Sequence, residues 1–207
     1  FDRDGDLDLV VTGGTKPNGY FINQGDATFV ECGEAAGLDQ QGDWSLGVSV
    51  ADHDNDGDRD ILFLNDGPNR LLANNGDGSF KDVTANSGLN DEHRSASAAW
   101  ADLDGDGLLD LFVTNLLDEF KPQASSLYLT GARSVMYRNL GHGRFEDVSS
   151  EVGRSGLQEG SSYIASLIDF NHDFRTDLLI TEEFGGIFAL NRIYENMGIK
   201  SDGGWIH

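Results

Sequence analysis

The stretch Asp52-His-Asp-Asn-Asp-Gly-Asp-Arg-Asp60, followed at once by Ile61-Leu-Phe-Leu64, decides the fold. Carboxylates stand at alternate positions, a glycine allows the chain to reverse, and the last aspartate leads directly into a short apolar run. Oxygen ligands in this spacing are what a hard divalent cation requires. We therefore interpret the stretch both as a metal-binding loop and as the marker of a repeating unit.

The same loop recurs along the chain. Its other copies are Phe1–Asp8, Asp102–Asp110 and a weaker one at Asp169–Asp177. Asp52 and Asp102 are 50 residues apart and Asp102 and Asp169 are 67 apart, which indicates an insertion in the third unit, roughly over residues 116–133. The first copy lacks its leading residue, so we expect the chain to be a fragment of a longer protein.

One unit can be followed around the second loop. Small alternating residues precede the loop at Trp44–Ala51, and strand-like runs follow at Ile61–Leu64, Asn69–Asn74 and Phe80–Val83. Asn75-Gly-Asp-Gly78 is typical of a tight hairpin, because glycine supplies the positive φ. Four short antiparallel strands at this period predict an all-β fold, a β-propeller of four-stranded antiparallel blades. A closed ring needs more than about four units, so we expect a partial propeller.

The domain organisation follows from these repeats. We predict units over residues 1–42, 43–93, 94–160 and 161–200, and the start of a truncated C-terminal module over residues 201–207. Helical periodicity is nearly absent. Only Glu34-Ala-Ala36 and its equivalents are predicted to form a helical turn.

Calcium is the cation that the loops favour. It takes six to eight oxygen ligands in irregular geometry, whereas magnesium prefers a tighter octahedral shell, and zinc and iron prefer sites with Cys or His. We predict two to four Ca²⁺ ions, with backbone carbonyls supplementing the carboxylates near the glycine turn. The candidate ligands are Asp2, Asp4, Asp6 and Asp8; Asp52, Asp54, Asp56, Asp58 and Asp60; Asp102, Asp104, Asp106, Leu108 and Asp110; and Asp169, Asn171, Asp173 and Asp177.

A plainer interpretation is that Asp and Gly simply favour turns. It would suffice for one such loop, but it does not explain three copies at the same point of a repeat. In the fourth copy Phe174 replaces the glycine and Asn171 replaces an aspartate. Because a left-handed turn is costly for a non-glycine residue, metal binding and its absence both stay open for that loop.

Composition excludes some partners. The formal net charge is −22, with 36 acidic and 14 basic side chains, which leaves no electrostatic footprint for nucleic acid. No apolar run has the length of a membrane-spanning helix, so we expect no direct membrane insertion. Cys32, the single cysteine, is expected to fill an apolar core position. We expect His53 and His172 to point outward, and Trp44 and Trp100 to pack in the core or between blades.

These loops resemble those of the FG-GAP/VCBS repeat family, whose members are similar to the β-propeller of integrin α-subunits. Within that family, Asn74–Thr84 and Tyr137–Val148 are similar to segments of acidic-cartilage-protein-like members. Tyr194–Gly198 and Gly204–His207 resemble the lead-in to an ASPIC/UnbV module. The resemblance implies a calcium-stiffened propeller that is secreted, at the cell surface or periplasmic. It implies a non-enzymatic role in adhesion or ligand display, with an extracellular protein or carbohydrate as partner.

Two other functions stay open. One is a carbohydrate-binding lectin propeller with pockets between blades. The other is a propeller glycosidase or lyase, since paired carboxylates are abundant. The chain has no Gly-x-Ser-x-Gly elbow, phosphate-binding loop or His-Glu-x-x-His helix, and no catalytic residue carries over from the resemblance. The insertion over residues 116–133 is either a partner-binding loop or an ordinary surface excursion.

Overall fold

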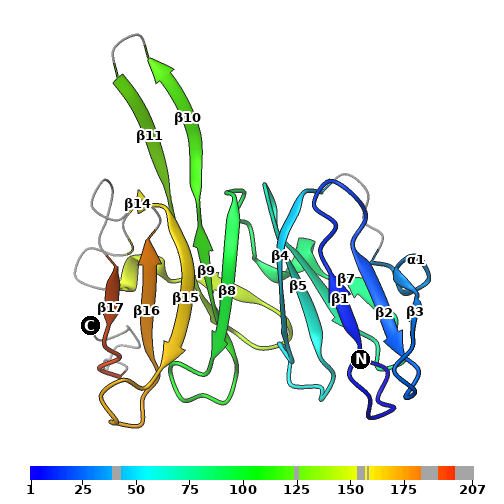
Figure 1. Cartoon of the computed structure of the whole chain (residues 1–207). Coiled ribbons are helices and arrows are strands. Elements are labelled where there is room, and N and C mark those ends of the chain that lie inside the picture. Colours follow the sequence, from blue (N-terminus) through cyan, green and yellow to red (C-terminus); the bar gives the residue numbers. More distant parts are fainter. Residues whose placement is uncertain (39–42, 124–125, 153–156, 158, 183–190, 199–207) are drawn as a thin grey trace.

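A computed structural model of the chain describes residues 1–38, 43–123, 126–152, 157, 159–182 and 191–198. Nearly all of its regular structure is antiparallel β, arranged as a row of twisted sheets that stand side by side (Figure 1). The all-β prediction and the four-stranded blades are therefore confirmed. The predicted module at residues 201–207 lies outside the described residues.

Two sheets are complete four-stranded blades. The first has the order β4-β5-β6-β7, and the second has the order β8-β9-β12-β13. In both sheets, strands that are consecutive within the blade are hydrogen-bonded neighbours. In each, the Asp loop joins the first two strands. Their bounds are β4 Ser45–Ala51, β5 Asp60–Asn65, β6 Arg70–Asn74, β7 Phe80–Asp82, β8 Ser95–Ala101, β9 Asp110–Asn115, β12 Val135–Asn139 and β13 Phe145–Asp147.

Two three-stranded sheets flank these blades. β1, β2 and β3 correspond to the second, third and fourth strands of a complete blade, whereas β15, β16 and β17 correspond to the first three. Their bounds are β1 Leu9–Val11, β2 Gly19–Asn23, β3 Phe29–Glu31, β15 Ser162–Ile168, β16 Asp177–Glu182 and β17 Arg192–Tyr194. The innermost strands β4, β8 and β15 lie next to one another, as their small residues predict.

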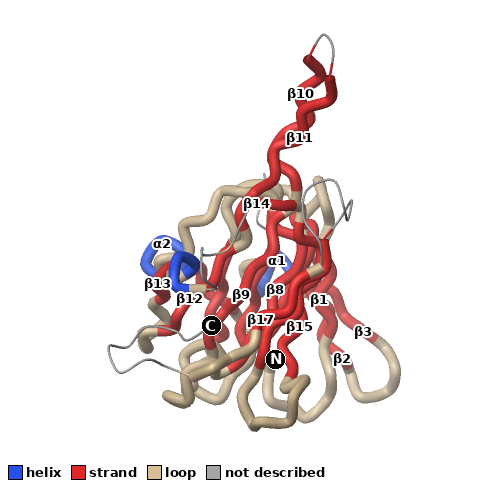
Figure 2. Tube along the Cα trace, turned by 90° about the vertical axis from the view of Figure 1, so that its left-hand side faces the viewer, coloured by secondary structure: helices blue, strands red, loops and turns tan. Residues whose placement is uncertain are grey.

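The insertion in the third unit forms a long hairpin. β10 (Leu117–Gln123) pairs with β11 (Ser126–Arg133), whose base pairs with β14 (Glu159–Gly160). The hairpin projects from the side of the molecule opposite the Asp loops, as Figures 1 and 2 both show. It is therefore an excursion from the blade rather than part of it.

Each of the first three units also contains one short helical turn, as predicted. The turns are α1 (Gly33–Ala36), α2 (Thr84–Ser87) and a 3₁₀ turn at Ser149–Glu151. Gly37 and Gly88 follow the two α turns with φ of 82°, a left-handed conformation that glycine adopts without a Cβ penalty.

The core consists of three clusters, each between neighbouring sheets. Side chains alternate across every strand, so that Ile61 and Phe63 face the first sheet while Leu62 and Leu64 face the third. Trp100 lies between blades and donates its indole N–H to the Ser49 hydroxyl at 3.0 Å, as expected. Cys32 is partly buried against the cluster that holds Ile61 and Phe63, also as expected. Trp44 is less covered, because it is 46% exposed and its ring lies under the Arg94 guanidinium of the next unit at 5.6 Å.

Candidate metal centre

The leading aspartate of the second, third and fourth loops folds the backbone back on itself. The Asp52 carboxylate accepts hydrogen bonds from the backbone N–H groups of Asp56 (3.1 Å) and Gly57 (3.0 Å). Asp102 and Asp169 make the equivalent contacts in their loops. Gly57 has φ of 93°, a left-handed conformation, so glycine suits this position. The result is a tight turn whose remaining carboxylates point to a common centre.

The closing aspartate of each loop has a buried carboxylate whose hydrogen bonds hold the loop in place. One oxygen of Asp60 accepts the backbone N–H of Asn74 at 2.8 Å, and the other accepts the N–H of His53 at 2.9 Å. The same pair of contacts recurs at Asp110 and Asp177. Because one carboxylate holds both the loop and the third strand, this residue has a structural role in addition to the ligand role predicted for it.

The predicted ligands come together most closely in the second and third loops. Among the described residues, one ligand atom from each of Asp52, Asp54 and Asp56 lies within 4.8 Å of the other two. In the third loop the group within the same distance is Asp102, Asp104 and Asp110, where the closing aspartate takes the place of Asp106. Three carboxylates at this distance repel one another in the absence of a cation.

Electrostatics supports a cation at these groups. The Oδ1 atom of Asp54 is buried, and it has no hydrogen-bond partner in the described part of the chain. Partial burial, together with the charges of neighbouring carboxylates, raises the pKa of Asp54 and of Asp104. Burial, aided by repulsion from Asp104 and Asp106, raises the pKa of Asp110 to about 7. An orphaned buried oxygen among crowded carboxylates fits a hard divalent ion.

His53 does not point outward, so the expectation for it was wrong. Its ring is buried, with Nδ1 2.5 Å from an oxygen of Asp60, and it stacks on Phe145 of the next blade at 6.2 Å between ring centres. Burial alone would lower the pKa of His53, but the hydrogen bond and charge of Asp60 outweigh it and raise this pKa. His172, in contrast, is exposed as expected.

The first loop repeats the turn contacts of the other loops and also pairs with the second loop. Asp2 and Asp4 accept hydrogen bonds from the N–H groups of Asp4 and Asp6, as Asp104 and Asp106 do from those of Asp106 and Leu108. Asp8 accepts the Tyr20 hydroxyl at 3.2 Å and the backbone N–H of Asn23 at 3.0 Å. Arg3 reaches across to the second loop and binds both oxygens of Asp58, at 2.6 and 2.5 Å. The side chain of Asp58 thus bridges two loops, while Leu108, its counterpart in the third loop, has no carboxylate to do so.

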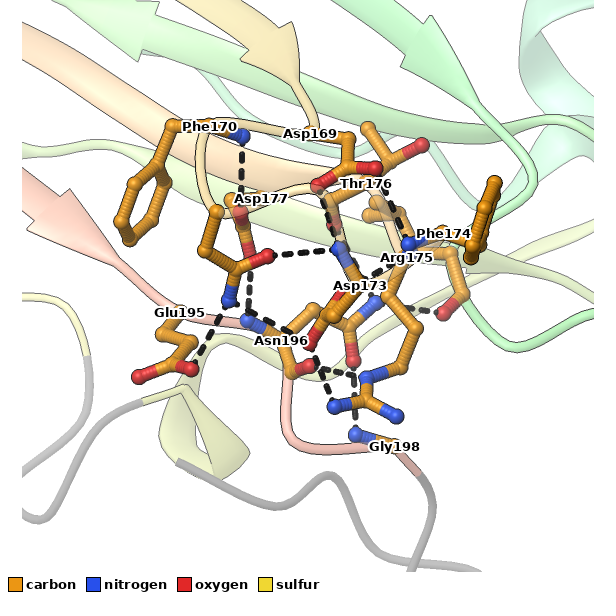
Figure 3. A network of polar contacts seen from close by, with 12 residues as sticks. Asp169, Phe170, Asp173, Phe174, Arg175, Thr176, Asp177, Glu195, Asn196 and Gly198 are labelled. Atoms are coloured by element: carbon orange, nitrogen blue, oxygen red, sulfur yellow. Dashed lines mark hydrogen bonds and ion pairs between the residues drawn. The ribbon is translucent and has the colours of Figure 1, made fainter.

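The fourth loop already contains a cation of its own. The Arg175 guanidinium lies 2.5 Å from an oxygen of Asp173 (Figure 3). The same oxygen also accepts a hydrogen bond from the Asn171 amide at 3.2 Å. Phe174 has φ of 67° and a side chain that is 98% exposed. The loop therefore keeps the shape of the others in spite of Phe174, but its carboxylate is paired with arginine.

A set of asparagines that sequence reasoning missed joins the blades at the loops. The side-chain amide of Asn139 donates to the backbone carbonyl of His53 in the preceding blade at 2.8 Å. We call Asn74, Asn139 and Asn196 the Asn clamps, because the other two contact the carbonyls of Phe1 and Leu103 in the same way, at 3.0 and 2.9 Å. Their signal was present in the sequence, since Asn23, Asn74 and Asn139 end the third strand of their units and Asn196 follows the third strand of the last unit by two residues.

The family follows from comparison with known proteins. A family model described as FG-GAP-like repeat matches residues 1–63 and 52–113, and together these cover more than half of the 207 residues. The chain belongs to the FG-GAP-like repeat family. Each matched range spans two of the Asp loops.

Two curated relatives of this FG-GAP-like chain carry the name Cartilage acidic protein 1. The one from Xenopus tropicalis is 28% identical over 200 residues, and the one from Homo sapiens is 29% identical over 199 residues. Each alignment covers 94% of this chain and 29% of the relative, so the chain spans under a third of the length of these relatives. The resemblance to FG-GAP/VCBS repeats of the acidic cartilage protein type is confirmed.

A solved structure of an Agrocybe aegerita lectin, described as recognising non-reducing terminal N-acetylglucosamine, is also similar. It is 15% identical, covers 97% of this chain and 64% of the lectin chain, and has a TM-score of 0.33, which is too low to support an argument. None of the helices in the described residues is long and apolar enough to cross a membrane.

Proposed function

We propose that this region is a calcium-stiffened set of propeller blades in a non-enzymatic scaffold that acts outside the cell in adhesion or ligand recognition. The observation that carries the proposal is the orphaned Oδ1 of Asp54, which lies among the carboxylates of the second loop. A buried oxygen without a donor is costly, and a divalent cation removes that cost.

Calcium would be held by the second and third loops. Asp52, Asp54 and Asp56 would supply carboxylate oxygens in the second loop, and their equivalents in the third loop are Asp102, Asp104 and Asp106, with Asp110 close by. The bound ion contributes positive charge at the point where the first two strands of a blade meet. It therefore ties these strands together and offsets both the burial and the carboxylate repulsion that raise the pKa of Asp54 and Asp104.

Two observations support the scaffold role: the names of the relatives, and the use of the loop carboxylates in hydrogen bonds and candidate metal groups. Cartilage is a tissue with abundant extracellular matrix, and the relatives are named for it. Outside the cell, modules of this type bind calcium with dissociation constants of about 0.1–1 mM, so they are loaded at ambient calcium. The carboxylates that could serve a glycosidase are taken up by loop hydrogen bonds and by the metal groups, which favours a scaffold over an enzyme.

A thermal melt with a chelator, and then with calcium, tests the proposal. At about 1 mM calcium each site contributes roughly 0.4–1.4 kcal/mol of stability. Two sites then raise the Tm by roughly 2–10 °C for a chain of this size. Magnesium at the same concentration should give a much smaller shift, because it does not accept the irregular oxygen shell.

Matched variants locate the effect. Asp54→Asn and Asp104→Asn should each remove about half of the calcium-dependent shift. Asp26→Asn is the control, because Asp26 is exposed and its carboxylate binds Thr28 within its own hairpin. Equal calcium shifts in all three variants, or no shift in the parent protein, would show that the loops are turns without a metal.

A further inference from the structure

The second and third Asp loops are joined by a side chain that belongs to neither candidate metal group. The amide of Asn55 donates to the backbone carbonyl of Gly107 at 2.8 Å, and the two loops lie side by side at the same edge of the molecule (Figure 1). Asn55 stands between Asp54 and Asp56, two members of the group in the second loop. Gly107 is the turn residue of the third loop, and its N–H binds Asp102 at 3.0 Å. One side chain therefore links the two candidate metal groups.

The position of Asn55 has the same left-handed backbone in all four loops. The φ angle is 60° at Asn55, and it is 66°, 79° and 63° at the equivalent residues Arg3, Gly105 and His172. Asparagine adopts this conformation more readily than most residues other than glycine. Arg3 uses the position in the same way as Asn55, since its side chain binds Asp58 of the following loop. Gly105 has no side chain with which to reach the fourth loop.

A buried contact sets the spacing between the second and third loops. The Asn139 clamp donates to the His53 carbonyl of the second loop at 2.8 Å and to the Leu109 carbonyl of the third at 3.0 Å. The backbone N–H of the same residue binds Asp110, a member of the third-loop group, at 2.9 Å. Because both loops are held by one residue, the distance that Asn55 must span is fixed.

We propose that calcium binding at the second and third loops is positively coupled, and that the side chain of Asn55 transmits the coupling. This inference rests on the proposed function, because it concerns the same two metal groups. Without a cation the carboxylates of each group repel one another and disfavour the closed turn. The contact between Asn55 and Gly107 requires both turns to be closed, so it stabilises the state with two bound ions and not the states with one. Either loop can fill first, since coupling between two sites is reciprocal.

Equilibrium dialysis of the whole chain against about 0.01–10 mM calcium measures the number of bound ions and the steepness of binding. One hydrogen bond makes the second ion bind about 2–10-fold more tightly than the first, which gives a Hill coefficient of about 1.2–1.5. Asp54→Asn and Asp104→Asn each leave one group intact, so their single-ion affinities give the curve of two independent sites. We expect the parent curve to be steeper than this reference.

Asn55→Gly removes the link and keeps the backbone, because Gly105 holds the left-handed conformation at the same position of the third loop. We expect this variant to bind two ions with a Hill coefficient of about 1. Asn75→Gly is the control, because the Asn75 amide binds Ser79 within its own hairpin at 2.9 Å. The control should bind calcium as steeply as the parent does.

The background that lacks the third-loop group separates coupling from damage to the second loop. In Asp104→Asn, adding Asn55→Gly should leave the affinity for the single ion unchanged, whereas a loss of affinity there would mean that Asn55 only supports its own loop. Independent binding of two ions by the parent, or an Asn55→Gly curve as steep as that of the parent, overturns this inference alone. A parent that binds no calcium overturns the proposed function and this inference together.

Discussion

The side-chain amide of Asn139 lies 2.8 Å from the backbone carbonyl of His53, and this contact joins the third blade to the Asp loop of the second. The same amide also donates to the carbonyl of Leu109 at 3.0 Å, while its oxygen accepts the N–H of Gly141 at 2.9 Å. One buried side chain therefore fixes its own hairpin, its own loop and its neighbour. Substitution of such a residue should affect both the blade and the junction.

Replacing Asn139 with Ala should lower the free energy of unfolding by about 2–4 kcal/mol, because buried donors and acceptors lose their partners. Asn23→Ala is the matched comparison: Asn23 makes the same contacts within its own unit, but no preceding blade lies beside it in this chain. Urea unfolding of both variants should show a smaller loss for Asn23→Ala, by about 1 kcal/mol. Equal losses would mean that the contact between blades contributes nothing.

Replacing Phe174 with Gly should stabilise the protein by about 0.5–1 kcal/mol. Phe174 holds a left-handed φ of 67° that costs roughly 1–2 kcal/mol for an L-residue, and its exposed ring makes no compensating burial. The greater flexibility of glycine in the unfolded chain offsets part of that gain. Gly107→Ala in the third loop, where φ is 88°, should have the opposite sign in the same urea titration. A loss of stability in Phe174→Gly would contradict the argument.

The fourth loop should not add to the calcium response. Its Asp173 is paired with Arg175, so Asp173→Asn should leave the calcium-dependent Tm shift within error of the parent value. Arg175→Ser should free this carboxylate and add an ion. Isothermal titration calorimetry should then count one more calcium per chain in Arg175→Ser than in the parent. An unchanged count would show that Phe174 and Asn171, rather than the arginine, prevent binding.

Acid should weaken the turns that follow the outer strands. Although burial opposes it, hydrogen bonds from Ser149 and the charge of Arg133 lower the pKa of Asp147. A lowered folded-state pKa means that the stability it gives is present above about pH 4 and is lost as the pH falls below it. Asp147→Asn should therefore cost about 1 kcal/mol at pH 7 and less at pH 2.5. Urea unfolding at both values measures this.

The equivalent residue in the second blade gives an independent check. Asp82 binds Thr84 and Arg70, and these contacts likewise lower its pKa against the effect of burial. Asp82→Asn should show the same dependence on pH. Glu146→Gln, at the exposed position next to Asp147 in the same strand, should cost the same small amount at both pH values. A cost in Asp147→Asn that does not depend on pH would contradict the assignment.

Much of the fold could be predicted from the sequence, because the Asp loops fix the repeat and the apolar runs fix the strands. The second blade illustrates this: the run at Ile61–Leu64 falls within β5, Asp60–Asn65. The orientation of His53 could not be predicted, since it depends on Phe145 in the next blade, 92 residues away. The pairing of Arg175 with Asp173 was equally hidden, because arginine at that position is ordinary in a surface loop.

The structural role of the closing aspartates could not be predicted from the sequence either. Asp60 and Asp110 were predicted only as ligands, whereas each also holds two backbone N–H groups. Such contacts are set by how the third strand returns past the loop, and that depends on packing rather than on local spacing. The Asn clamps were missed for a related reason, because asparagine before a glycine turn is explained by the turn alone.

The acceptor of every Asn clamp is a main-chain carbonyl, and the residues that supply it are Phe1, His53 and Leu103, three unrelated side chains. For this contact a blade therefore needs no particular amino acid in its neighbour. Duplication, deletion or exchange of a unit by recombination needs no matching second substitution to preserve the contact. Each unit carries its own asparagine, and the acceptor carbonyl is part of any polypeptide backbone. This contact therefore does not limit how the number of blades changes over evolutionary time.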